Sequence, residues 1–143
     1  LLEQPSNTLL KQTLFLSTIA WLISKYSQTK PHAADLSNAK KRILNIKELM
    51  ASMPEQEFSL IELAEMANLS QWHFLRQFKK HVGLSPHAWL IQARLQKSQK
   101  LLRQGLNLSE VSQQCGFSDQ SHFSRHFRQA FGITPGGYIA YLK

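Results

Sequence analysis

The sequence predicts an all-α fold in which a unit of two helices occurs twice. Apolar residues recur at three- and four-residue spacing along most of the chain, and no alternating stretch of useful strand length occurs. One short pattern is repeated: His73–Phe78 and His122–Phe127 lie forty-nine residues apart. Each copy is followed after four residues by Gly, and then by Ser-Pro or Thr-Pro. A repeat of this kind indicates a duplicated structural unit, so we expect the function to depend on what the two copies do together.

The composition limits the function classes. A chain of 143 residues can bury one core or two small ones, and 43% apolar with 18% charged residues is typical of a folded protein. Seventeen Lys and Arg against nine Asp and Glu give a net charge of +8. From Ser59 onward ten basic residues face four acidic ones, so +6 of the +8 lies with the repeat. Such an excess fits nucleic acid, an anionic membrane or mere solubility.

The cellular location is predicted from cysteine usage and hydropathy. The single Cys115 excludes an internal disulfide framework and agrees with a reducing cytoplasm. Polar residues interrupt the apolar stretch Leu9–Ile23, which is too short to span a membrane. We therefore expect a cytoplasmic, nucleoid-associated protein with no membrane partner.

An amphipathic helix is predicted from about Asn7 to Tyr26, with Ser6 or Asn7 as its cap and Thr29–His32 as its end. Its apolar face has few local partners, so we expect it to pack on a missing upstream domain or on a second subunit; packing on the rest of this chain is the alternative. Because the sequence begins with Leu1 rather than Met, we interpret residues 1–33 as a helix and linker that form the tail of an effector-binding or dimerisation domain.

Helix start and stop signals divide the remainder, residues 34–143, into further elements. A helix is predicted from about Leu36 to Met53. Two capping boxes, Ser59 to Glu62 and Asn107 to Glu110, each begin a short helix, which a turn separates from a longer one ending at a Gly. Helix, turn and helix make a helix-turn-helix. We expect the first at about 59–83, the second at about 107–132, and between them a linking helix at about 86–103, roughly 26 Å long at 1.5 Å per residue.

The longer helix of each unit is two-sided when its residues are placed 100° apart. Three apolar side chains of each copy fall on one side, and we expect all six in the core: Phe74, Phe78, Val82, Phe123, Phe127 and Phe131. The opposite side carries polar, basic and aromatic residues, with Leu75 and Ser124 on its flank: Trp72, Arg76, Lys79, Ser121, Arg125 and Arg128.

A basic helix face of this kind matches the major groove of double-stranded DNA, where Arg can bond guanine in a bidentate manner. Successive major grooves on one side of the duplex lie about 34 Å apart, so one monomer could place both helices in adjacent grooves. The alternatives are ordinary surface charges for Arg76 and Arg125, partial packing for Trp72, and cover by a neighbouring helix for Leu75. Leu75 would otherwise meet a thymine methyl group.

The second unit resembles the DNA-binding domain of the AraC/XylS family of bacterial transcription regulators. The most specific match runs from Gly116 to Phe127 and continues through Gly132-Ile133-Thr134-Pro135 and Tyr138, while the whole resemblance covers about Leu36 to Leu142. It implies a seven-helix domain with two recognition helices in adjacent major grooves of a promoter, and an activator that contacts RNA polymerase. By position, the base-reading candidates are Trp72, Leu75, Arg76, Gln120, Ser121, Ser124 and Arg125. We predict phosphate contacts for Ser70, Lys79, Lys80, Ser118 and Arg128.

Two departures from the family pattern concern the C-terminus. Ile139 follows Tyr138 where the family commonly has Arg, and Gly136-Gly137 are expected to soften a last helix that is normally firm.

Three other functions compete with this one. An enzyme or metal site would have to use Cys115 and the six His, of which His122 and His126 are four apart on one helix but have no third ligand nearby in sequence. We predict no catalytic residue, metal or cofactor, and expect Cys115 to be buried and the His residues to flank the DNA face or pack against the turns. A sequence-neutral architectural DNA-binding protein is the main alternative; a helical protein-interaction module would bind no DNA.

Overall fold

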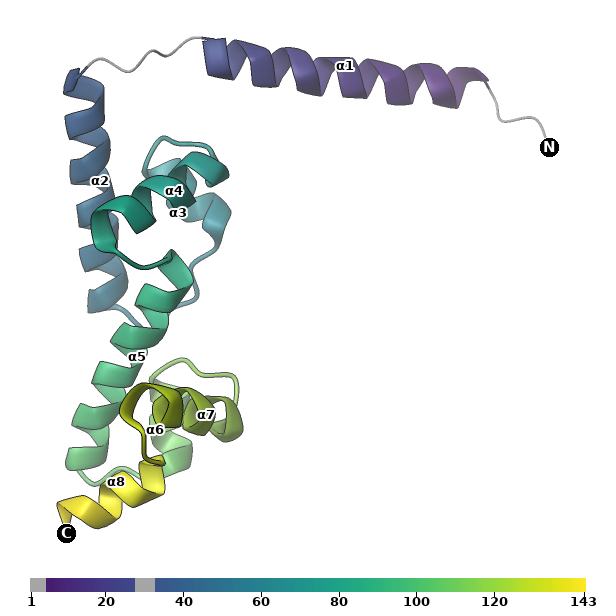
Figure 1. Ribbon diagram of the computed structural model, residues 1–143. Coiled ribbons are helices and arrows are strands. Elements are labelled where there is room, and N and C mark those ends of the chain that lie inside the picture. The colour runs from purple at the N-terminus through teal and green to yellow at the C-terminus, as the bar shows by residue number, and fades with distance from the viewer. Residues whose placement is uncertain (1–4, 28–32) are drawn as a thin grey trace. The chain divides into compact units, whose positions relative to one another are not determined.

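The computed structural model describes residues 5–27 and 33–143, and within these ranges the chain forms eight α-helices and no strand (Figure 1). Residues 1–37 and 38–143 form two compact parts. The all-α prediction is confirmed. The helices are α1 Pro5–Ser27, α2 Ala33–Ser52, α3 Leu60–Met66, α4 Gln71–Val82, α5 Pro86–Arg103, α6 Leu108–Gln114, α7 Gln120–Phe131 and α8 Pro135–Leu142.

The N-terminal part contains α1. This helix begins at Pro5, so Ser6 and Asn7 lie inside it and the prediction that one of them caps it is wrong; the fixed φ of proline suits a first helical turn. The predicted end at Thr29–His32 lies outside the described residues. Leu9, Leu14 and Ile23 expose about three fifths of their side chains.

The first helix-turn-helix unit is formed by α3 and α4, and it packs against α2. Its core contains Ile43, Ile46 and Met50 of α2 together with Phe74 and Phe78 of α4, all at most 3% exposed. Arg42 Nε donates a hydrogen bond of 2.9 Å to the Ala67 carbonyl in the turn between α3 and α4. The capping box is present, since Glu62 N donates to Ser59 Oγ (3.1 Å) and Ser59 N donates to Glu62 Oε2 (3.3 Å).

The second helix-turn-helix unit, α6 and α7, has a core of its own. Val111, Cys115, Phe123 and Phe127 are fully buried in it. Asn107 and Glu110 form the second predicted capping box. The two units therefore start from the same local signals and are each closed around a phenylalanine pair.

The linking helix α5 runs without interruption, as predicted, from its cap Ser85 to Arg103. Leu90 belongs to the core of the first unit, and the next residue, Ile91, belongs with Leu95 and Leu102 to the core of the second. Figure 1 shows α3 and α4 grouped around one end of α5, and α6 and α7 around the other. One helix thus carries both units.

One expectation about the core needs correction. Phe131, predicted to be buried, exposes 38% of its surface, because the C-terminal turn of α7 extends past the second core; its ring touches Phe127 edge-on, with 4.6 Å between centroids. Val82 at the end of α4 is half-buried and packs against the first core, as predicted. Periodicity identifies a helix face but not how far along it the core extends.

The last helix forms in spite of its two glycines. Gly136 and Gly137 lie within α8, whose first turn has Thr134 as cap and Pro135 at its start. Tertiary contacts outweigh the cost of two glycines: the Tyr138 ring packs 5.6 Å from Phe127, and its hydroxyl accepts a hydrogen bond of 2.9 Å from Arg103 Nε.

Phe127 and Phe131 give a direct test of these boundaries. We expect Phe127→Ala to lower the free energy of unfolding by about 3 to 5 kcal/mol, because it leaves a cavity in a fully buried site. Phe131→Ala should cost no more than about 1.5 kcal/mol, because much of that ring is already in water. Chemical denaturation followed by circular dichroism measures both; similar losses would place the two rings in the same core.

Candidate nucleic-acid interface

The caps of α4 and α7 fix where each longer helix begins. Ser70 caps α4 by accepting a hydrogen bond of 3.2 Å from His73 N, and Asp119 caps α7 by accepting one of 2.7 Å from His122 N. In both units the capping residue lies three positions before the repeated His. The second turn has one extra residue, Ser118, between Phe117 and the cap. Equivalent residues therefore take the same places on α4 and α7, although the turn before α7 is one residue longer than the turn before α4.

In the first unit the predicted outward residues are exposed. Trp72 exposes 55% and Leu75 39% of its surface, and Arg76, Lys79 and Lys80 are exposed as well. The Arg76 guanidinium lies over the Trp72 ring, 5.3 Å from its centroid. Stacking of this kind holds an Arg in place while leaving its N–H groups available to an acceptor such as a base edge. Trp72 therefore supports Arg76 and is not packed in the core.

In the second unit Gln120, Ser121, Arg125 and Arg128 are exposed, and Ser124 is half-buried. Arg125 occupies the position of Arg76, and Ser121 that of Trp72. No aromatic ring thus stacks beside Arg125 from that position. The structure brings the predicted base-reading residues onto one face within each unit, and the two faces differ in chemistry.

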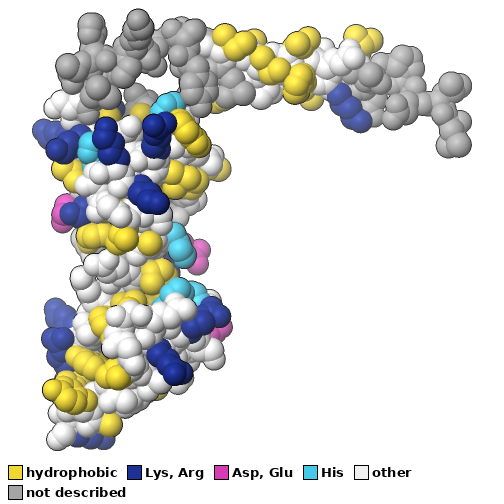
Figure 2. All heavy atoms as spheres, in the orientation of Figure 1, with side chains coloured by type: hydrophobic (Ala, Val, Ile, Leu, Met, Phe, Trp, Pro, Cys, Tyr) yellow, Lys and Arg dark blue, Asp and Glu magenta, His cyan; other side chains and the backbone are white. Residues whose placement is uncertain are grey.

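Among the residues that the structure describes, the cations of these faces have no carboxylate partners. Among the described residues only two ion pairs occur, Lys47 with Glu48 and Lys97 with Glu55, and neither involves α4 or α7. Figure 2 shows several dark-blue Lys and Arg side chains on the part that carries both units, with few Asp or Glu. Unpaired cations on a rigid helix face are suited to bind phosphates.

A neighbouring basic group on α2 was not predicted from the sequence. The pKa of His81 is lowered by burial and, in smaller measure, by the charges of Lys40 and Lys80. Lys40 is thus close to the end of α4 that carries the predicted phosphate contacts. In the sequence, only the positive charge of Lys40 could have indicated a phosphate contact, because α2 and α4 are far apart along the chain.

The two predicted serine contacts differ in their availability. The hydroxyl of Ser70 is half-buried and already engaged, since it caps α4 and lies 2.8 Å from His73 Nδ1. Ser118 is exposed.

His122 and His126 form a pair on α7. Their Nε2 atoms lie 3.0 Å apart, and both rings pack against Phe117 of the turn. His122 Nδ1 is buried and has no hydrogen-bond partner, so we assign the proton of His122 to Nε2, which then donates to His126; the other tautomer would bury an unsatisfied N–H. The expectation that His122 packs against the turn is confirmed.

Cys115 and the possible metal ligands were the other candidates for chemistry. Cys115 is fully buried, as predicted, and burial raises the pKa of its thiol to about 11. Within the ranges that the structure describes, no cluster of three or more His, Cys, Asp or Glu is arranged to hold a metal ion. No helix in those ranges is long and apolar enough to cross a membrane.

Comparison with known proteins agrees with this geometry. Residues 63–140 match the profile of a family described as a helix-turn-helix domain, which is more than half of the chain. The chain belongs to the AraC/XylS family of transcription regulators. It is 34% identical over 99 residues to the HTH-type transcriptional regulator MtrA of Neisseria gonorrhoeae, covering 68% of this chain and 33% of MtrA. It is 37% identical over 94 residues to the HTH-type transcriptional activator RhaS of Salmonella schwarzengrund, covering 63% and 34% of the two chains.

Solved structures with this fold extend the comparison. The DNA-binding domain of AdpA, a global transcriptional factor in complex with a target DNA, matches with a TM-score of 0.66 and 29% identity, covering 70% of this chain and 91% of that one. A transcriptional regulator from Chromobacterium violaceum, with an AraC-type DNA-binding domain, matches with a TM-score of 0.63 and 28% identity over 73% and 91% of the two chains. This chain spans about a third of the length of the first curated relatives it matches.

The histidine pair predicts a pH dependence of stability. The pKa of His126 is lowered by burial and then by the charges of His122, Arg125 and His87, so the folded protein favours the neutral ring. The unfolded chain then binds more protons below its ordinary pKa near 6.5, so this stability is present above that pH and is lost as the pH falls below it. We expect the melting temperature to fall less between pH 7.5 and 5.5 in His126→Gln than in the wild type.

The matched control is Gln129→Ala, a change at an exposed position of the same helix that removes no titrating group and should leave the pH profile unchanged. His81, whose pKa is also lowered, contributes to the wild-type profile, so only the difference between variants measures His126. Parallel melting curves for wild type and His126→Gln at every pH would contradict the assignment.

Proposed function

We propose that the chain binds double-stranded DNA sequence-specifically, as a transcription regulator that inserts α4 and α7 into adjacent major grooves. The observation that carries this is the equivalent placement of Arg76 and Arg125 on two helices that buried phenylalanine pairs anchor to the cores. Both side chains are exposed and have no carboxylate partner among the residues that the structure describes. The target DNA bound by the related AdpA domain gives further support.

We assign base reading to the exposed helix faces and positioning to their edges. The guanidinium groups of Arg76 and Arg125 would each bond a guanine, the Gln120 amide an adenine, and Leu75 a thymine methyl. Trp72 would stack beside Arg76, and Ser121 and Ser124 would bond base edges. Phosphates would be held by Lys79, Lys80, Ser118 and Arg128, with Ser70 contributing through its cap. Because the faces differ, the binding site should consist of two unlike blocks about one turn apart.

We further propose that the protein acts in the cytoplasm, on nucleoid DNA, and activates transcription by contacting RNA polymerase. The name of the related RhaS, a transcriptional activator, supports activation. Transcription from a promoter that carries the selected site, with purified polymerase and with or without this protein, tests it; an unchanged or lower transcript level would contradict activation.

A sequence-neutral architectural protein is the competing function, favoured by the net charge alone. Selection of bound fragments from genomic DNA separates the two, since an architectural protein would enrich no common sequence. The ratio of specific to non-specific affinity is decisive, because both kinds of binding weaken in salt.

Arg125 and Arg128 form a matched pair for the site assignment. We expect Arg125→Ala to cost about 1 to 3 kcal/mol on the selected site and much less on random DNA, as a base contact should. Arg128→Ala should weaken binding to both DNAs equally and reduce the slope of log affinity against log salt by about one. Fluorescence anisotropy measures both. Equal losses on the two DNAs for Arg125→Ala would remove it from base reading.

We also propose that α1 joins two copies of the chain. Leu9, Leu16 and Ile23 follow each other at seven-residue spacing and are all more than 60% exposed, as expected of a coiled-coil seam whose partner is an identical helix. Two joined copies would present four recognition helices to neighbouring sites.

Leu16 is the residue to change, since it lies in the middle of this seam. We expect the wild-type chain to be a dimer by light scattering after size-exclusion chromatography, and Leu16→Lys to be a monomer with the same melting temperature for residues 38–143. Ser17→Lys, one residue away and off the seam, is the control. A monomeric wild type at 100 μM would contradict the proposal.

A further inference from the structure

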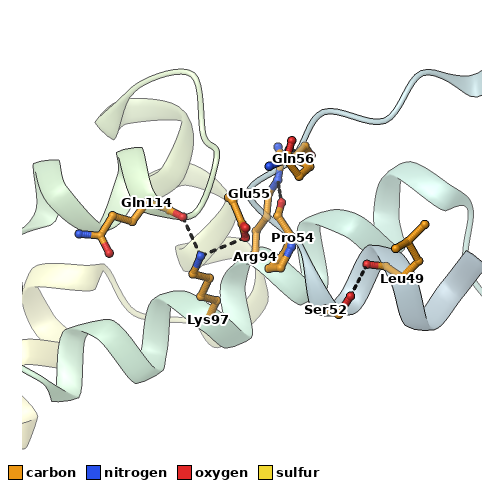
Figure 3. Close-up of polar contacts among 8 residues, drawn as sticks. All are labelled: Leu49, Ser52, Pro54, Glu55, Gln56, Arg94, Lys97 and Gln114. Atoms are coloured by element: carbon orange, nitrogen blue, oxygen red, sulfur yellow. Dashed lines mark hydrogen bonds and ion pairs between the residues drawn. The ribbon is translucent and has the colours of Figure 1, made fainter.

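The two helix-turn-helix units meet at a polar junction, formed by Pro54, Glu55 and Gln56 before α3, Arg94 and Lys97 on α5, and Gln114 to Gly116 at the end of α6. The hydrophobic cores stay separate, and no apolar cluster of the described residues spans both. In addition to α5 itself, the junction therefore supplies polar contacts that relate one unit to the other (Figure 3).

Arg94 fixes the first side of the junction. It is only 7% exposed, and it donates from Nε to the Pro54 carbonyl (2.7 Å) and from Nη2 to the Gln56 carbonyl (3.0 Å). A buried guanidinium with two backbone acceptors holds its partners tightly, because their loss would leave the charge unsatisfied. The loop before α3 is thus fastened onto the middle of α5.

Lys97 connects that loop to the second unit. Its ammonium donates to Glu55 Oε2 (3.1 Å) and to the carbonyl of Gln114 (3.0 Å), the last residue of α6. Backbone hydrogen bonding and the Lys97 ammonium lower the pKa of the Glu55 carboxyl, which keeps it charged. One side chain on α5 is therefore bonded to both units at once.

Gly116 shows how closely the two units approach. It has a φ of +85°, and a Cβ built there would lie 2.7 Å from the Glu55 carbonyl oxygen and 2.9 Å from Glu55 Cα. Both atoms belong to backbone, which cannot turn aside as a flexible side chain can. Glycine is required at this point for two independent reasons, the left-handed conformation and the contact.

We propose that Lys97, Glu55 and Gly116 are positioning residues that set the separation and rotation of α4 relative to α7, and thereby the spacing of the two DNA blocks that the protein accepts. Without them, no hydrogen bond or ion pair among the described residues would link the loop before α3 through α5 to the end of α6. Two rigid bodies joined by one helix can still rotate slightly about the axis of that helix. Even a small rotation would displace the outward faces of α4 and α7 by a large distance, because these faces lie far from the axis. The inference rests on the proposed function, since spacing matters only if both helices read DNA.

A distance measurement tests the mechanical part without DNA. Spin labels on Glu65→Cys in α3 and Ser109→Cys in α6, both exposed positions, report the separation of the units by pulsed electron paramagnetic resonance. The buried Cys115, with its raised pKa, should remain unlabelled. We expect one narrow distance for the otherwise unchanged chain and a broadened one for Lys97→Met and for Glu55→Gln.

Two further variants separate positioning from general stability. Lys100→Met removes an exposed lysine one turn along α5 that forms no ion pair among the described residues, and should leave the distance narrow. Lys97→Arg keeps donors for both Glu55 and Gln114, so this variant should again give a narrow distance distribution. Gly116→Ala should shift the distance, because the backbones must part. If Gly116→Ala fails to fold, Lys97→Met and Glu55→Gln still decide, since a half-exposed ion pair adds little to stability.

The DNA part uses duplexes that carry the two selected blocks at their native spacing and one base pair closer or farther. We expect Lys97→Met to lose about two- to fivefold in affinity at the native spacing and less at the altered ones, so that the preference for the native spacing becomes weaker. Binding to a single block should not change. An unchanged distance distribution and an unchanged spacing preference would overturn the proposal.

The two hypotheses fail in different ways. If the wild type selects no sequence, the proposed function is wrong, while the distances still test the junction. If it selects a site but Lys97→Met weakens all spacings and the single block equally, the function stands and the positioning role is wrong.

Discussion

The rest of the structure depends on one constraint: α5 belongs to two hydrophobic cores at once. Leu90 is buried in the first and Ile91 in the second, so adjacent residues of one helix turn to different units. Between the ends of the helix, the buried side chains of Arg94 and Ser98 are polar, and they bond to backbone carbonyls. Each unit can thus fold around its own phenylalanine pair, while their mutual placement depends on a few directional contacts. Directional contacts specify an orientation more sharply than apolar burial, which is non-directional.

Local signals predicted the elements because they act within one turn of helix. The two capping boxes and the caps Ser70 and Ser85 each join residues three apart, and these local bonds form wherever the chain places them. Where the sequence misled us, longer-range contacts decided. Phe131 has the period of a core residue but lies beyond the core, and α8 is stabilised by Tyr138 packing on Phe127 despite its two glycines.

The outward face of each recognition helix was predictable for the same reason, as periodicity alone separates it from the phenylalanine side. Two other features, the histidine contacts at the second turn and the bonds of Arg94 and Lys97, could not be predicted from the sequence. The stacking of Arg76 on Trp72 could be guessed from their four-residue spacing, but the edge-on contacts of His122 with His126 and Phe117 depend on the turn. Arg94 bonds to backbone carbonyls and Lys97 to a loop carboxylate, and these partners lie about forty residues away in the sequence. Every residue has a backbone carbonyl, so the sequence does not indicate which carbonyl accepts such a bond.

The turns of the two units also differ in how freely their sequences can change. Asn68 and Gly116 both adopt a left-handed conformation at the equivalent place, with φ of +56° and +85°. Asn68 is exposed, and asparagine and glycine both tolerate that conformation, so drift between them should carry little cost. Gly116 faces the Glu55 backbone and has no such alternative. Of the two units, only the first therefore has a turn whose left-handed residue is free to change, while glycine in the second is required by the backbone of the first.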